Sequence, residues 1–177
     1  AGIFVMFVFA NINYNNLIRW ANLFYWLMMI SLFVVLFAGH TTMGAQRWIK
    51  LGSFQVQPSE FMKIILALTV IRFILIRAKD AFSPKNLLKI AVIIAFPSVL
   101  ILKQPDFGTA ILIVPVILVI MFMGQMPWKK LAAILLIGLM IIPAGYFFLQ
   151  DYQKQRIQVF LNPDIDRLGA GYNVIQS

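Results

Sequence analysis

The sequence predicts an all-α, polytopic transmembrane helix bundle, on two observations. Hydrophobic residues make up 62% of the 177 residues and charged residues only 12%, whereas ordinary globular domains carry about 45–50% apolar and about 25% charged residues. The apolar residues also fall in long blocks and not at the spacing of an amphipathic helix. Because so few charges cannot cover a soluble surface, we expect about five full membrane spans and one partial span.

Six apolar segments account for these spans. The first, 2–10, is too short to cross a bilayer, which takes about 20 residues, and it lacks the basic flank of a signal peptide. We therefore expect it to be the end of a truncated span in a longer protein. Pro97, Pro115 and Pro143 lie inside later segments, where neighbouring helices can satisfy the freed carbonyls. The five full spans are expected at 20–38, 59–76, 87–102, 107–123 and 131–149.

The polar segments between the spans suggest how the chain is oriented. Lysine and arginine numbers are similar on the two sides, but the acidic residues gather on one side, which we take to be the outside. The cytoplasmic side then holds 11–19, 77–85 and 124–130, and the outer side holds the loops 40–58 and 103–106. We expect 1–149 to form the bundle and 150–177 to begin a large extracytoplasmic loop.

Composition excludes several classes of site. The formal charge is +9, but the basic residues sit between apolar blocks, which favours membrane topology and anionic lipid over nucleic acid. There is no cysteine and only one histidine, His40, so disulfides and thiolate or multi-histidine metal sites are excluded. Asp164 and Asp166 resemble part of a calcium loop, but its glycine and glutamate positions are not met. We expect no metal site.

Glu60 and Lys63 are the sharpest candidates for function. They lie three residues apart, so they share one helix face, and Pro58 and Ser59 before them suit a helix start with serine as the cap. Ionisable residues inside a membrane are costly and usually face a cavity or a partner. They therefore line a polar cavity for a charged head group, or else Glu60 complements the helix dipole while Lys63 snorkels outward.

Two further segments hold candidate residues. In the loop from Gly44 to Trp48, Arg47 suits a phosphate and Trp48 suits a sugar face, although an interfacial tryptophan with a lipid-phosphate contact explains both equally well. Asp106 precedes a helix and is expected to be its N-cap, with Lys103 as ion partner. Near the far end of the Glu60 helix, Arg72 and Arg77 are interpreted as structural residues that reach the interface.

Five strings in this order resemble motifs of one family, the shape, elongation, division and sporulation family, and most closely its rod-shape branch. They cover the chain from about Gly44 to Ser177. The strings are Gly44-Ala45-Gln46-Arg47-Trp48, Gln57-Pro58-Ser59-Glu60-Phe61-Met62-Lys63, Gln104-Pro105-Asp106-Phe107-Gly108-Thr109, Tyr152-Gln153-Lys154-Gln155-Arg156-Ile157, and Leu168-Gly169-Ala170-Gly171-Tyr172-Asn173 with Gln176-Ser177.

The resemblance implies a ten-span enzyme of the bacterial cytoplasmic membrane that polymerises lipid II into glycan strands for cell elongation, beside a class B penicillin-binding protein. It implies no cofactor, although a divalent cation is left open. It places the residues matching Glu60 and Lys63 in an outward cavity. With the neighbouring motif residues, the candidate substrate-binding set is Glu60, Lys63, Arg47, Trp48, Gln57, Ser59 and Asp106.

Two departures from the family pattern bear on activity. Arg167 follows Asp166 where the family usually has proline, which affects local loop shape. The family's essential outer-loop aspartate lies downstream of Ser177, so the catalytic residue is unknown, and we expect this chain to be inactive alone. Two other functions fit the residues: a lipid II flippase or transporter, and a membrane scaffold that recruits a penicillin-binding protein.

Overall fold

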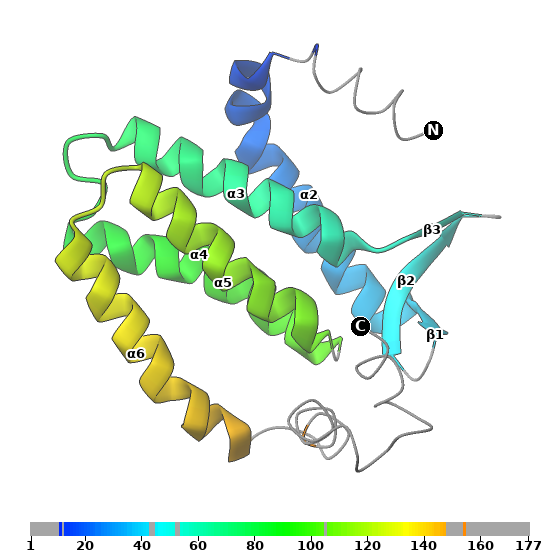
Figure 1. The fold of residues 1–177 in the computed structure, drawn as a ribbon. Coiled ribbons are helices and arrows are strands. Elements are labelled where there is room, and N and C mark those ends of the chain that lie inside the picture. The colour runs from blue at the N-terminus through cyan, green and yellow to red at the C-terminus, as the bar shows by residue number, and fades with distance from the viewer. Residues whose placement is uncertain are drawn as a thin grey trace. The chain divides into compact units, whose positions relative to one another are not determined.

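The structure, a computed structural model, describes residues 11, 13–42, 45–51, 54–104, 106–147 and 154. These residues divide between two compact units, 1–127 and 128–177, and each is described by itself. The first unit holds helices α2 (Tyr14–Ala38), α3 (Pro58–Ile76), α4 (Pro84–Lys103) and α5 (Phe107–Met123), together with strands β1 (His40–Thr42), β2 (Ala45–Leu51) and β3 (Phe54–Val56) (Figure 1). The second unit holds α6 (Trp128–Phe147).

The described residues are mostly helical, which confirms the predicted helical class. Two helical stretches, Tyr14–Phe37 and Pro84–Lys103, are long and apolar enough to cross a membrane, and Gly108–Met123 is a shorter apolar helix. The predicted number of spans stays a prediction. The segment 2–10 and the boundary at 149/150 lie outside the described residues.

The helix ends follow local sequence rules more closely than the hydropathy blocks do. α5 has the predicted bounds, and α3 starts one residue early at Pro58. The polar segment before residue 20, predicted to be a loop, is instead the start of α2: Asn13 caps it by accepting a hydrogen bond from the Asn15 N–H at 3.0 Å. α4 similarly begins at Pro84, three residues before the predicted start, because proline suits a first helical turn.

Ser59 does not cap α3. The N-cap residue is Gln57, whose side chain makes no capping hydrogen bond, and Pro58 occupies the first turn. The predicted serine cap is therefore wrong, because the Ser59 hydroxyl lies inside the helix and donates its hydrogen bond to another element.

The core of the first unit lies where α2, α3, α4 and α5 meet. Leu32, Met62, Ile101 and Ile113, one from each helix, are almost fully buried. Large apolar side chains on the opposite faces are exposed, such as Trp26 at 63%. An apolar exterior around an apolar core is typical of a helix bundle whose solvent is lipid.

Pro97 sits inside α4, and another helix compensates for its missing N–H. Proline at this position leaves the Ile93 carbonyl, four residues earlier, without its helical donor. The Tyr25 hydroxyl on α2 donates a hydrogen bond to the Ile93 carbonyl oxygen at 3.0 Å. The proline thus creates a polar contact between α2 and α4 in an apolar core, as expected for membrane helices.

The predicted loop 40–58 contains a small antiparallel sheet, which corrects the all-α expectation locally. Its strand order is β1-β2-β3. His40 pairs with Trp48 in one ladder, and Ile49 pairs with Val56 in the other. The sheet follows the end of α2 and leads into α3, and β2 contacts both helices (Figure 1). It therefore lies at the end of the bundle where α3 begins.

Candidate functional site

Asp106 is the centre of a buried polar cluster between α3 and α5. Its side chain caps α5 by accepting a hydrogen bond from the Thr109 N–H at 3.3 Å, which confirms the predicted N-cap. One carboxylate oxygen also accepts from Gln57 Nε2 at 2.8 Å and from Ser59 Oγ at 3.0 Å. Asp106 is only 4% exposed. A buried carboxylate with these donors fixes the start of α3 against the start of α5.

Arg47 brings strand β2 to this cluster. Its Nη1 lies 3.7 Å from Asp106 Oδ1, and its Nε donates a hydrogen bond to the Gln104 carbonyl oxygen at 3.2 Å. The described ion partner of Asp106 is therefore Arg47 and not Lys103, which lies exposed at the end of α4. The prediction chose Lys103 because it is near Asp106 in sequence, but the sheet brings Arg47, a cation distant in sequence, to the carboxylate.

Glu60 and Lys63 form the predicted pair on one face of α3. Lys63 Nζ lies 2.8 Å from Glu60 Oε2, and the exposed fractions of the two side chains are 21% and 52%. Thr109 Oγ1 donates to Glu60 Oε1 at 3.4 Å. Thr109 thus joins the pair to the Asp106 cluster, since its N–H bonds to Asp106 and its hydroxyl to Glu60.

Gln104 also lies in this region, although the sequence predicted no role for it. It is 1% exposed, and its Nε2 donates to the Leu32 carbonyl oxygen at 2.8 Å. Its own backbone carbonyl receives Arg47. The buried Oε1 has no hydrogen-bond partner among the described residues. The sequence signal that could have identified Gln104 is its position as a polar residue between the apolar helix α4 and Asp106, the N-cap of α5.

Strand geometry places Trp48 on the face of β2 opposite Arg47. It is half-buried in β2 beside Arg47, and successive side chains of a strand point to opposite faces. Arg47 and Trp48 therefore do not act on one ligand face of this strand. The role predicted for Trp48 in substrate binding stays a prediction.

The remaining candidates can be placed only in part. Gly44, Asp164, Asp166 and Arg167 lie outside the described residues. Among the described residues, no three His, Asp or Glu side chains are grouped so that they could hold a metal ion. At the far end of α3, Arg72 Nη1 donates to the carbonyl oxygens of Ile18, at 2.9 Å, and Arg19, so Arg72 ties α3 to the first turns of α2.

Comparison with known proteins places the chain in a family. The family of FtsW, RodA and SpoVE, described as cell cycle proteins, matches residues 1–177. The peptidoglycan glycosyltransferase MrdB of Escherichia coli K12 is 38% identical over 99% of this chain and 48% of its own length. MrdB of Helicobacter pylori is 36% identical over 99% of the chain and 46% of its own length. The chain thus spans about half the length of the curated relatives it matches.

Solved structures agree with these relatives. One solved chain belongs to a structure described as the structural coordination of polymerization and crosslinking by a peptidoglycan synthase complex. It aligns with a TM-score of 0.78 and 28% identity, over 99% of this chain and 52% of that one. The rod-shape-determining protein RodA of Thermus thermophilus aligns with a TM-score of 0.63 and 26% identity, over 81% and 46%. The chain is a membrane protein and belongs to the FtsW/RodA/SpoVE family of cell cycle proteins.

Proposed function

We propose that this chain forms part of a peptidoglycan glycosyltransferase that polymerises lipid II into glycan strands for cell elongation. The observation that carries the proposal is the 38% identity to MrdB, a protein named for this activity, across 99% of the chain. The structure supports it with a polar cluster at the end of an otherwise apolar bundle, where α3 and α5 begin. The protein would cross the bacterial cytoplasmic membrane several times, with this cluster on the outer side.

The reaction needs a cationic environment for its leaving group. A sugar hydroxyl attacks the anomeric carbon of a second lipid-linked sugar, and the lipid pyrophosphate leaves with the electron pair of the broken C–O bond. The leaving group gains negative charge as that bond breaks, so fixed cations stabilise the transition state more than the ground state. A base must also take the proton of the attacking hydroxyl. We assign that base to none of the described residues.

Lys63 is the residue we place nearest to the leaving pyrophosphate. An ammonium group has three N–H donors, and Glu60 uses one of them. Two donors remain for a phosphate oxygen. Glu60 holds the lysine in position, while Thr109 holds Glu60. Arg47 is fixed by Asp106 and the Gln104 carbonyl, and it adds positive charge at the same end of the bundle.

Asp106, Gln57 and Ser59 are positioning residues in this proposal. The Asp106 carboxylate is occupied by hydrogen bonds from both side chains and is nearly buried. It is therefore better suited to holding Arg47 and the two helix starts than to taking a proton from substrate. A class B penicillin-binding protein is the proposed partner, supported by the likeness to a chain studied in a peptidoglycan synthase complex.

Polymerisation of lipid II by the full-length protein tests the proposal. The purified protein with its penicillin-binding partner should extend labelled lipid II into glycan strands resolved on a gel. Movement of labelled lipid II across vesicles without any polymer would favour the transporter alternative. Recruitment of the partner with neither activity would favour the scaffold.

A further inference from the structure

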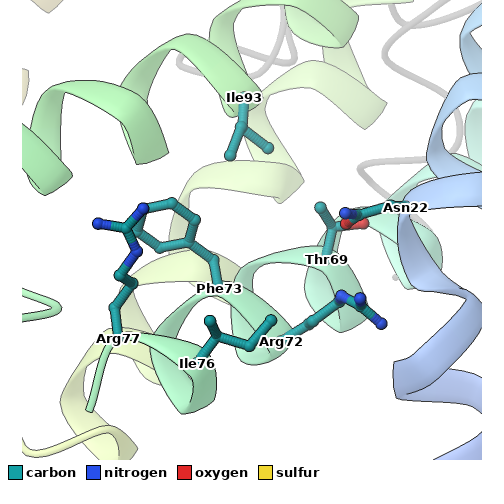
Figure 2. A pocket seen from close by; sticks show the side chains of 7 residues that line it. All are labelled: Asn22, Thr69, Arg72, Phe73, Ile76, Arg77 and Ile93. Atoms are coloured by element: carbon teal, nitrogen blue, oxygen red, sulfur yellow. The ribbon is translucent and has the colours of Figure 1, made fainter.

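A second polar feature lies in the first unit, away from the Asp106 cluster. A pocket of about 210 Å³ opens between α2, α3 and α4, on the half of α3 that ends at Ile76. Figure 2 shows its lining residues, which are Asn22, Thr69, Arg72, Phe73, Ile76, Arg77 and Ile93. Arg72 is twelve positions after Glu60 in α3, which is about 18 Å along a helix axis. The pocket is thus separate from the site proposed for glycosyl transfer.

Among the residues that the structure describes, the lining combines two arginines with no acidic side chain. Within the part of the chain that the structure describes, Arg72 Nη1 donates hydrogen bonds to two backbone carbonyl oxygens and the buried Nε has no partner. The carboxylate of Asp80 lies in the turn after α3, and it accepts a hydrogen bond from Asn86 Nδ2 at 2.9 Å. Within the described residues, no carboxylate neutralises Arg72 or Arg77 by an ion pair. Cations left in an apolar surrounding favour an anionic ligand.

Arg77 is placed to bind such a ligand. Its guanidinium carbon lies 5.9 Å from the centroid of the Phe73 ring, and Figure 2 shows Phe73 between the two arginine side chains. Stacking on a ring restrains the guanidinium while leaving its N–H groups available, and these match the oxygens of a phosphate.

The rest of the lining identifies the chemical class of the ligand. Phe73, Ile76 and Ile93 supply apolar walls, and Ile76 is 66% exposed, so the pocket is open toward the surroundings of the bundle. Lys85 and Lys89 lie at the start of α4, and clustered cations beside membrane helices attract anionic lipids. We propose that this pocket binds the phosphodiester of an anionic lipid head group, or a free phosphate ester of the same chemistry.

Thermal unfolding of the full-length protein in lipid nanodiscs tests this proposal. Phosphatidylglycerol added to phosphatidylcholine discs should raise the unfolding midpoint of the native protein, and glycerol phosphate added to phosphatidylcholine discs tests the soluble source. Arg77→Gln should remove the rise and weaken phosphatidylglycerol binding by roughly tenfold or more, as expected for loss of a charged hydrogen bond. Lys79→Gln removes the same charge from a residue outside the pocket lining, and it should retain the rise.

Ile93→Phe tests whether binding in the pocket, and not general attraction to surface charge, produces the rise in the unfolding midpoint. It fills the pocket without changing any charge, so it should also abolish the rise, whichever of the two phosphate sources produces it. The proposal is overturned if neither source stabilises the protein, or if both Arg77→Gln and Ile93→Phe respond as the native protein does. Equal losses in Lys79→Gln and Arg77→Gln, with none in Ile93→Phe, would assign the effect to general attraction and also overturn it.

Discussion

The Ser59 hydroxyl, in the first turn of α3, donates a hydrogen bond to the Asp106 carboxylate at the N-cap of α5, with 3.0 Å between the oxygens. The residues are 47 positions apart in sequence. The same carboxylate lies beside Arg47 from β2. One side chain therefore holds two helix starts and the sheet together at the end of the bundle where we place the chemistry.

Asp106→Asn should destabilise the protein by about 1–3 kcal/mol, because the amide carries no charge for Arg47 and turns an NH₂ group toward existing donors. Thermal or denaturant unfolding of the purified protein in detergent measures this. Asp80→Asn is the matched control, since Asp80 is exposed and bonds one neighbouring side chain. Equal effects of the two changes would contradict the central position of Asp106.

Tyr25→Phe should cost about 0.5–2 kcal/mol, because the Ile93 carbonyl then loses the donor that replaces the missing N–H of Pro97. Pro97→Ala restores a helical N–H for this carbonyl. In the Pro97→Ala background, Tyr25→Phe should therefore cost less, and a double-mutant cycle of unfolding free energies measures the difference. Additive effects would show that the proline and the tyrosine do not share the carbonyl.

Gln104→Glu should be more damaging than Gln104→Met. Methionine loses the hydrogen bond to the Leu32 carbonyl but also removes the buried oxygen that has no hydrogen-bond partner among the described residues. Glutamate instead places a carboxylate against that carbonyl, at a cost of at least about 2 kcal/mol more. Unfolding midpoints in detergent compare the two variants. A glutamate variant as stable as the methionine variant would mean that Gln104 is not packed as described.

The helices were predictable because long apolar blocks end at residues with clear backbone preferences. Proline at 58 and 84 and the polar Asn13 set the observed starts of three helices. Hydropathy alone places these starts later, since the first turns of α2 and α4 are polar. Capping residues set where a helix starts, and a mean hydropathy over a segment does not detect them.

The sheet was missed although the sequence contains a hairpin pattern. Only two residues, Gly52 and Ser53, separate β2 from β3, and a pair of this type between strands is typical of a tight hairpin. β2 has seven residues, but its partner β3 has only three. The contact of Arg47 with Asp106 depends on this sheet, so a prediction without it assigned the nearer Lys103 instead.

The pair Glu60 and Lys63 was predictable as a pair but not as part of a network. Helical spacing places the two charges on one face, and the structure brings them to 2.8 Å. Thr109 on α5, which links them to Asp106, follows from packing between helices that are distant in sequence. Local periodicity carries no information about such contacts.

Polymerisation of lipid II by the full-length Lys63→Ala variant tests the central claim most directly. A fixed cation at the leaving pyrophosphate is worth about 10²–10³ in rate, so glycan formation per folded protein should fall by that factor while membrane insertion stays normal. Lys129→Ala, an exposed change on α6, should retain native activity. Polymer formation by Lys63→Ala within about twofold of the native protein would contradict the account and leave Lys63 as a side chain that only reaches the interface.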